Sequence, residues 1–138
     1  SDALLSVRSL IPQGYDFVVI DTAPALDWST LAGLYAADIV LSPVNLSRWT
    51  IQATSLLNEH LLQMTTPPAL SLVPSIVTEK ERETLEEIKT NFAGELTTTA
   101  IHKAAMIRTS ANKAQRLKDT HAAFLEFEAL ADELTRGK

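Results

Sequence analysis

The hydrophobic positions of this chain fall first into short uninterrupted runs, which are typical of strands buried on both faces of a parallel sheet. The clearest run is Phe17 to Ile20, four large apolar residues that end at the carboxylate of Asp21. Pro74 lies inside a later run and predicts a bulge or an edge position there, because proline cannot donate a backbone hydrogen bond. Together with one threonine-rich run, the pattern predicts four strands, at Asp16–Asp21, Asp38–Val44, Ala69–Val77 and Glu95–Ile101.

Between these runs, apolar residues recur every three or four positions, the spacing of one face of a helix. Asp27 is a suitable N-cap for the second helix, and Gly94 is a suitable stop for the fourth. The predicted helices are Asp2–Ile11, Trp28–Ala37, Trp49–Met64, Glu79–Phe92 and Ala122–Leu134. The alternation of strands and helices indicates right-handed βαβ units. We therefore expect one α/β domain over residues 1–138, with a partly parallel sheet flanked by helices.

The acid that ends the first predicted strand is the leading candidate for chemistry. Open α/β sheets bind their ligands at the carboxyl ends of the strands, and Asp21 would lie there. A turn follows at once, through Thr22 and Pro24. Asp21 would either serve a ligand or cap this turn by accepting hydrogen bonds from the amides of Thr22 and Ala23.

Composition excludes several classes of protein. The chain is 46% hydrophobic and 21% charged, as in globular proteins, and it contains no cysteine. It therefore has no disulfide framework, no thiolate zinc site and no cysteine nucleophile. The three histidines are too far apart in the sequence to predict a metal site. No apolar run approaches the roughly 20 residues of a membrane span, so we expect a cytoplasmic protein without a membrane partner.

The charge is unevenly distributed. The chain carries a net −5, yet the stretch from Leu96 to Lys118 has no acidic residue. This basic segment is either a surface for anions or DNA, or a solvated amphipathic stretch. Its five basic residues are Lys103, Arg108, Lys113, Arg116 and Lys118.

Two blocks of sequence resemble the ParA/MinD (deviant Walker A) ATPases. The first is Tyr15-Asp-Phe-Val-Val-Ile-Asp-Thr-Ala-Pro24, which resembles the family's Walker B and switch II strand. The second is Leu31-Ala-Gly-Leu-Tyr-Ala-Ala-Asp-Ile-Val-Leu-Ser-Pro-Val44, which resembles the helix and strand that follow it. A third segment, Ile101-His-Lys-Ala-Ala-Met-Ile-Arg108, also resembles the family. The resemblance implies a P-loop NTPase-like fold of the ParA type.

The same resemblance implies a function in plasmid or chromosome partition. Family members use ATP and Mg²⁺, dimerise on ATP, bind DNA nonspecifically on the nucleoid and respond to a ParB-like partner. Asp21 would order the water shell of Mg²⁺, while Thr22 and Pro24 would shape the switch loop. The DNA-binding residues would be the basic side chains at and beyond the third segment: Lys103, Arg108, Lys113 and Arg116. Ala23 departs from the usual Pro-Pro and would leave the switch loop less rigid.

The resemblance covers only the C-terminal half of a family member. The phosphate loop, Lys-Gly-Gly-x-Gly-Lys-Thr/Ser, is not in these 138 residues, and the four glycines are scattered. Because clustered glycines let backbone amides surround phosphates, the chain alone is not expected to hydrolyse ATP or to hold a cofactor.

In the family, the phosphate-loop strand lies between the strands that correspond to Asp16–Asp21 and Asp38–Val44. Without it these two strands must pair directly, exchange elements with a second copy, or dock a partner that carries the loop. We therefore expect a fragment or truncated homologue of a partition ATPase that forms a homo-oligomer or binds such a partner. Two alternatives remain open: a stand-alone protein- or DNA-binding module from a mobile element, and an oligomerising structural remnant without a ligand.

Overall fold

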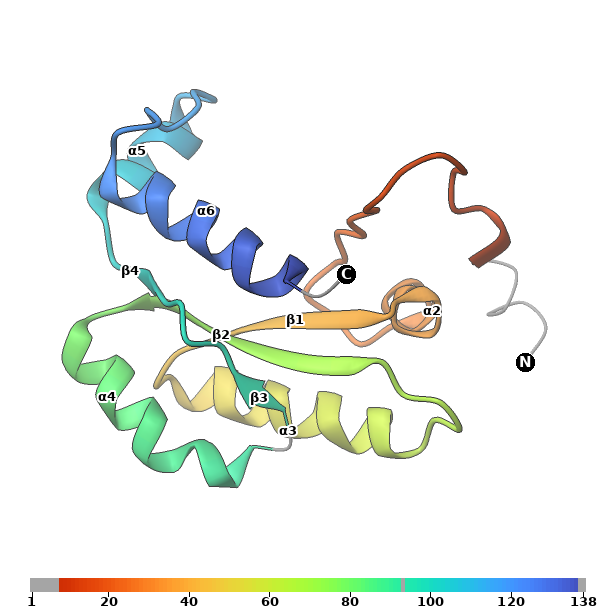
Figure 1. The fold of residues 1–138 in the computed structure, drawn as a ribbon. Helices are drawn as coiled ribbons and strands as arrows, with labels where there is room; N and C mark the ends of the chain where they lie inside the picture. The colour runs from red at the N-terminus through yellow and green to blue at the C-terminus, as the bar shows by residue number, and fades with distance from the viewer. Residues whose placement is uncertain (1–7, 93, 137–138) are drawn as a thin grey trace.

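The computed structural model describes residues 8–92 and 94–136, and Figure 1 shows its course. The predicted helix Asp2–Ile11 lies mostly outside these residues. The first half of the described chain contains α2 (Trp28–Ala36), β1 (Ile39–Val44), α3 (Arg48–Leu62) and β2 (Ala69–Val77). The second half contains α4 (Glu79–Ile88), the 3₁₀ helix η1 (Lys89–Asn91), β3 (Glu95–Leu96), β4 (Ile101–His102), α5 (Ala105–Asn112) and α6 (Ala122–Thr135).

The predicted parallel sheet is confirmed, and β2 is its central strand. One edge of β2 pairs in parallel with β1, from Ile39 opposite Ala69 to Val44 opposite Pro74. The other edge pairs in parallel first with β3 and then with β4. Within the described residues β1 pairs with β2 alone, so the second edge of β1 is open.

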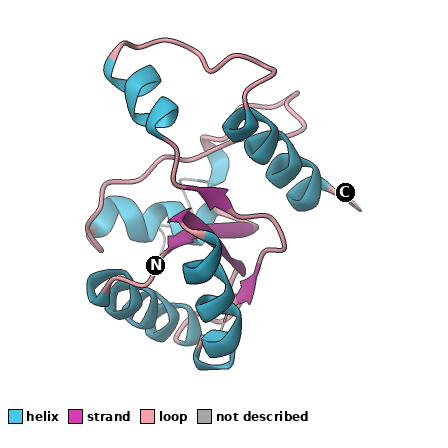
Figure 2. Cartoon of the chain, turned by 90° about the vertical axis from the view of Figure 1, so that its left-hand side faces the viewer, coloured by secondary structure: helices cyan, strands magenta, loops and turns pink. Residues whose placement is uncertain are grey.

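Helices lie on both sides of this sheet, as predicted for a P-loop NTPase-like α/β fold. Figures 1 and 2 show α3 and α4 on one face, whereas α6 lies on the opposite side and contacts β4. The main core forms between the sheet and α4, where Leu72 and Leu85 are fully buried. Leu41 lies on the opposite face of the sheet from Leu72, because it is in register with Ser71, and its side chain remains 48% exposed.

The predicted strand Asp16–Asp21 is wrong, because these residues form no regular secondary structure. Their apolar side chains point into solvent to a large extent: Phe17 is 57%, Val18 44%, Val19 92% and Ile20 41% exposed. A strand needs a neighbour to take up its backbone N–H and C=O groups. Among the described residues nothing pairs with this segment, and the direct pairing with β1 that we considered does not occur. We call residues 17–20 the unpaired apolar segment.

The fourth predicted strand, Glu95–Ile101, is correct in position but not continuous. It is divided into β3 and β4, and residues 97–100 leave the line of the sheet between them. The Thr97 N–H still donates to the carbonyl of Leu72, at 2.9 Å, but the amides of Thr98 and Thr99 donate to the carboxylate of Glu133 on α6. At Thr98 and Thr99, the Glu133 side chain therefore takes the place of a strand as hydrogen-bond acceptor.

The interruption also explains how a proline fits in the central strand. Leu72 directs its carbonyl toward Thr97, so Pro74, two residues on, has its nitrogen on the same side, where the pairing is interrupted. The register shifts between Ser75 and Val77, and Ile76 between them has a φ of 57°. The predicted bulge is thus confirmed, whereas an edge position for β2 is not.

The predicted helices after Pro24 are confirmed to within a few residues, with one exception. The helix predicted to reach Phe92 ends at Ile88 and continues only as η1. Side-chain caps account for the helix starts: Asp27 caps α2, Ser47 caps α3, and Thr78 and Glu81 form a reciprocal capping box on α4. In the described part of the chain, no helix combines the length and the apolar composition needed to cross a bilayer.

A substitution at Gly94 would test how closely β3 packs against β2. A Cβ atom at this position would lie 2.7 Å from Cγ and 2.9 Å from the carbonyl oxygen of Leu70, so β3 would have to move away from β2. We expect Gly94→Ala to lower the free energy of unfolding by about 1–3 kcal/mol, as overpacking does. Urea unfolding followed by circular dichroism measures the change.

Gly33→Ala is the matched control. It lies within α2, and its Cβ would meet the nearest atoms at 3.4 and 3.5 Å, an ordinary contact. Since alanine favours a helix over glycine, this variant should gain about 0.5–1 kcal/mol. Equal destabilisation by both substitutions would contradict the steric explanation.

Candidate functional site

The loop after Asp21 is fixed to the first turns of α2. The hydroxyl of Thr30, which is buried, lies 2.6 Å from the carbonyl oxygen of Ala25 and 3.4 Å from that of Ala23. The side chain of Thr22 lies over Gly33, on the next turn of α2. The segment that resembles switch II is therefore held against α2 through its backbone, although the residues before it form no strand.

Asp27 sets where α2 begins and so where this loop ends. One oxygen of its carboxylate accepts hydrogen bonds from the backbone N–H groups of Ser29 and Thr30, at 3.0 and 3.1 Å, and from the Ser29 hydroxyl at 2.6 Å. The Ser29 hydroxyl, followed by the Thr30 amide, holds the pKa of Asp27 below its ordinary value. Asp27 is therefore a structural cap that uses one carboxylate oxygen to hold the first turn of α2.

The candidate residues Asp21, Thr22 and Pro24 are all exposed in this loop. Asp21 follows no strand, so the structure does not place it at the carboxyl end of the sheet, contrary to our expectation. No hydrogen bond or ion pair engages its carboxylate within the described residues, and it does not cap the turn that follows. Its position leaves the carboxylate accessible to a ligand or to a partner.

The carboxyl end of β1 is closed by contacts within the chain. Asn45 Oδ1 accepts hydrogen bonds from the Ser47 amide at 2.9 Å and from the Thr50 hydroxyl at 3.0 Å. Ser47 Oγ accepts the Thr50 amide as the cap of α3. These residues stabilise the turn into α3, so their polar groups are used for structure.

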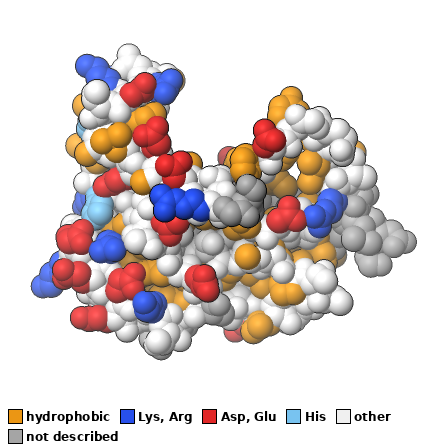
Figure 3. All heavy atoms as spheres, in the orientation of Figure 1, with side chains coloured by type: hydrophobic (Ala, Val, Ile, Leu, Met, Phe, Trp, Pro, Cys, Tyr) orange, Lys and Arg blue, Asp and Glu red, His pale blue; other side chains and the backbone are white. Residues whose placement is uncertain are grey.

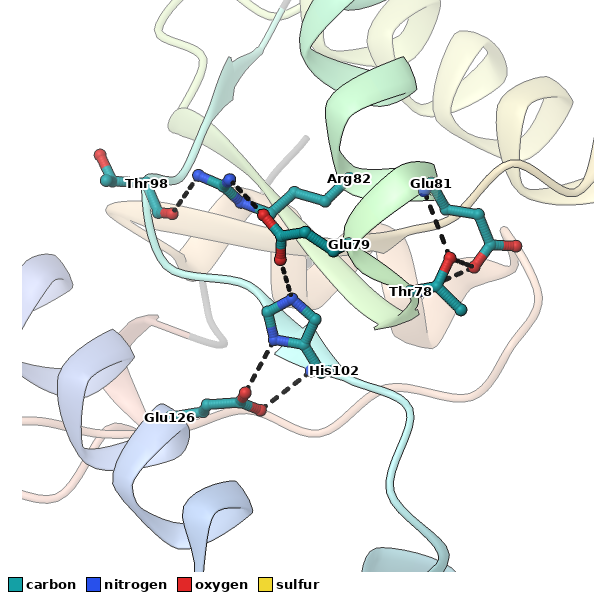
Figure 4. A network of polar contacts seen from close by, with 7 residues as sticks. All are labelled: Thr78, Glu79, Glu81, Arg82, Thr98, His102 and Glu126. Atoms are coloured by element: carbon teal, nitrogen blue, oxygen red, sulfur yellow. Dashed lines mark hydrogen bonds and ion pairs between the residues drawn. The ribbon is translucent and has the colours of Figure 1, made fainter.

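His102 joins two helices across β4, as Figure 4 shows. Its Nδ1 lies 2.7 Å from Oε1 of Glu126 on α6, and its Nε2 lies 2.9 Å from Oε2 of Glu79 at the start of α4. The second oxygen of Glu126 accepts the backbone N–H of His102 at 2.9 Å. We call His102, Glu79 and Glu126 the histidine clasp.

The protonation of the clasp follows from its contacts. The Glu126 carboxylate is the main cause of a raised pKa of His102, against the opposing effect of burial, and Glu79 adds to it. In turn His102 is the main cause of a lowered pKa of Glu79, with Arg82 adding to it. Farther along α6, burial would raise the pKa of Glu133, but the hydrogen bonds from Thr99 and Thr98 outweigh it and lower that pKa.

The basic candidates lie beyond the clasp, on and around α5. Lys103 and Arg108 are exposed, and Lys113 is exposed at the end of α5. Arg116 is less available, because its guanidinium is 3.0 Å from an oxygen of Asp119 and 5.4 Å from the ring centre of Phe124. Figure 3 shows Lys and Arg side chains at the tip of this lobe with an acidic side chain between them. The surface is therefore basic but not uniformly so.

Two further features bear on ligand binding. A shallow pocket of about 160 Å³ lies between α2 and the end of α3, where Trp28, Tyr35 and His60 line it. It does not include any candidate residue of the sequence analysis. Across residues 8–92 and 94–136, the structure has no group of three or more His, Asp or Glu side chains arranged to hold a metal ion.

Sequence reasoning missed the clasp and the role of Glu133. Glu79 and Glu126 are 23 and 24 residues from His102, so no local spacing links the three side chains. The spacing of the three histidines argues against a metal site but gives no information about carboxylate partners. The one local signal was the acidic residue that begins α4, next to a clear capping-box sequence. Only the sheet brings these three elements together.

The chain is similar to a known protein family and to a characterised protein. A family model described as an AAA domain matches residues 3–76, slightly more than half of the chain. Protein IncC of Escherichia coli is 47% identical over 47 residues, which make up 34% of this chain and 13% of IncC. The chain therefore spans a small part of the length of that relative. The family match includes the Asp21 loop, α2, β1 and α3, whereas the clasp and the basic segment lie outside it.

The contact between Thr30 and the loop gives a direct test of how the loop is held. Thr30→Val keeps the shape of the side chain but removes the hydroxyl, leaving the carbonyl of Ala25 without this partner. We expect a loss of about 1 kcal/mol in the free energy of unfolding. The carbonyl ¹³C chemical shifts of Ala23 and Ala25 should change as well, as NMR can measure, because the Thr30 hydroxyl donates to these two carbonyls. Thr109→Val, at an exposed position of α5, makes the same chemical change and should alter neither quantity.

Proposed function

Because the chain belongs to the AAA domain family of P-loop NTPases, we propose that it supplies the Walker B and switch II part of a ParA-type partition ATPase. It acts with a phosphate-loop segment that comes from another part of the same protein or from a partner. ATP and Mg²⁺ are bound only when this segment is in place. Nonspecific DNA binding through the basic segment accompanies the nucleotide-bound state.

One observation carries this proposal: two segments lack a strand partner within the described residues. One is the open edge of β1, and the other is the unpaired apolar segment. An apolar run that ends in an acid has strand composition but no neighbour. A single inserted strand would give hydrogen-bonding partners to both segments. In ParA-type proteins the phosphate-loop strand occupies this place.

The residues of this chain could form only part of a nucleotide-binding site. The exposed carboxylate of Asp21 suits a role toward the water shell of Mg²⁺, which needs one carboxylate and no cage of protein ligands. The 138-residue sequence offers no glycine cluster that would surround phosphates. When bound, Mg²⁺ would neutralise charge on the phosphates. The part of this chain would be to orient metal-bound water and to hold the switch loop on α2 through Thr30.

The basic segment supports the DNA-binding part of the proposal. Lys103, Arg108 and Lys113 are exposed, and none of the three forms an ion pair with another residue that the structure describes. Cations of this kind attract phosphate without reading sequence. The acidic body of the chain would direct DNA toward this lobe and away from α4.

Complementation tests the nucleotide part. A ParA-type protein with an intact phosphate loop, but with its own Walker B acid replaced by asparagine, is mixed with this chain and MgATP. Neither protein alone should hydrolyse ATP, whereas the mixture should. Asp21→Asn should lower this turnover by about 10- to 100-fold, the usual effect of losing an outer-shell metal contact.

Asp16→Asn is the matched control, since it removes an exposed carboxylate five positions earlier and should leave the complemented turnover unchanged. In the same mixture, the amides of Phe17 to Ile20 should become protected from hydrogen exchange. Turnover by the chain alone would overturn the proposal, and so would unchanged exchange at these four amides.

Salt titrations test the DNA part. Fluorescence anisotropy with a labelled random-sequence duplex should give an affinity that falls with rising salt. Lys103→Ala combined with Arg108→Ala should weaken binding and reduce the slope of log K against log salt by about 2, one unit for each lost phosphate contact. Lys80→Ala on α4 combined with Lys89→Ala at the start of η1 removes the same charge elsewhere and should leave the slope unchanged. Equal effects of the two pairs would mean that net charge alone governs binding.

A further inference from the structure

The histidine clasp joins three elements that are far apart in the sequence. Glu79 begins α4, His102 ends β4, and Glu126 lies in the second turn of α6. The clasp is partly open to water: the side chains of His102, Glu126 and Glu79 are 36%, 25% and 63% exposed. Protons can therefore reach the ring without unfolding of the chain.

The number of protonated nitrogens on the His102 ring determines how many of the two carboxylates it can hydrogen-bond. Both ring nitrogens lie within hydrogen-bond distance of carboxylate oxygens, which only accept hydrogen bonds. Both contacts can therefore be hydrogen bonds only when both nitrogens carry a proton, that is, in the imidazolium form. A neutral ring has one N–H and must leave one carboxylate facing a lone pair.

The geometry also indicates which contact is lost. Glu126 is held twice, because it also accepts the backbone N–H of His102. Glu79 has an alternative partner, since its other oxygen is 3.2 Å from Arg82, whose guanidinium also reaches the carbonyl of Thr98 at 3.4 Å. The remaining proton of a neutral ring is therefore best kept on Nδ1, facing Glu126.

From this arrangement, the geometry points to His102 as a proton-operated clasp that ties the start of α4 to β4 and α6 while protonated and releases Glu79 at the start of α4 when the ring becomes neutral. The inference concerns the C-terminal part of the chain and does not depend on the proposed nucleotide function. Its consequence is positional: Lys103 follows His102 directly in the chain, so the loss of the Glu79 contact removes one of the two carboxylates that hold its neighbour.

The other charged groups around the ring favour loss of the Glu79 contact before the Glu126 contact. On the α4 side, Arg82 holds Glu79, and Glu81 attracts Lys103 while serving the capping box. On the α6 side, Glu133 holds the amides of Thr98 and Thr99 and does not depend on the ring. After deprotonation α6 therefore remains attached at two places, and α4 loses its only link to His102.

The sign of the pH effect follows from the raised pKa of His102, whose ordinary value is 6.5. A raised pKa in the folded state means that the stabilisation is complete below pH 6.5 and is lost as pH rises through the folded-state pKa. NMR titration of the unmodified protein tests this without any variant. The His102 ring should titrate above 6.5. Titration at or below that value would overturn the inference.

Hydrogen exchange tests the release of α4. The amide of Lys103 donates to Val77 beside the clasp, at 2.9 Å. After correction for the intrinsic rate, its protection should fall by roughly two- to fivefold between pH 6 and pH 8.5, as expected for a part-exposed ion pair. Glu79→Gln should abolish this pH dependence, because an amide can donate to the lone pair of the neutral ring as well as accept from a protonated one.

Glu83→Gln is the matched control, because it makes the same charge change at another exposed position of α4 and should retain the wild-type pH dependence. If Glu79→Gln and Glu83→Gln behave alike, the clasp does not control the contact and the inference is wrong. A protection factor for Lys103 that is independent of pH in the wild-type protein would overturn it equally.

Discussion

The strand β2 provides the backbone hydrogen bonds on which the rest of the sheet depends. It pairs with β1 along one edge and with β3 and β4 along the other, and its buried side chains meet α4. Each apolar segment of the described chain that lies beside β2 is a strand. The unpaired apolar segment has a composition at least as favourable, yet it is not a strand. For buried backbone, a neighbour matters more than composition.

The second determinant of the fold is the pair of carboxylates, Glu126 and Glu133, that accept backbone hydrogen bonds from residues 98–102. Where the fourth strand breaks, Glu133 accepts two backbone amides, and Glu126 accepts a third at His102. The two acids are seven residues apart on α6 and so lie on one face of the helix. Charge-assisted hydrogen bonds of this kind are stronger than neutral ones, and they anchor α6 to β4. The carboxylates of Glu126 and Glu133 therefore link α6 to the backbone between Thr98 and His102.

The two halves of the chain differ in how far their function can be argued. The Asp21 loop, α2 and β1 lie within the family match, and the second edge of β1 has no strand partner within the described residues. The basic segment and the clasp lie beyond residue 76, the end of that match. Their roles rest on exposure, charge and geometry. The proposed ATPase role and the proton-operated clasp can accordingly fail independently of each other.

Local sequence signals were sufficient for most of the fold. Asp27, Ser47 and the Thr78–Glu81 pair begin helices where their side chains cap the first turn, and these starts need no information from elsewhere in the chain. The run Ala69–Val77 was predicted with the bounds that the structure shows. For the candidate site, the sequence indicates the loop with Asp21 and the basic residues. It does not predict the contacts of Arg116 with Asp119 and Phe124.

The sequence by itself thus determined the α/β class, the helix starts and the parallel pairing of the strands. These features follow from periodicity, from side-chain caps and from the alternation of strands and helices. Tertiary structure alone decided that Phe17–Ile20 is not a strand, that Thr97–Ala100 leaves the sheet, and that His102 lies between Glu79 and Glu126. Each of these outcomes depends on a hydrogen-bonding partner that is distant along the chain or not among the described residues. Periodicity carries information about which side of an element is buried, but not about which group will face a given N–H.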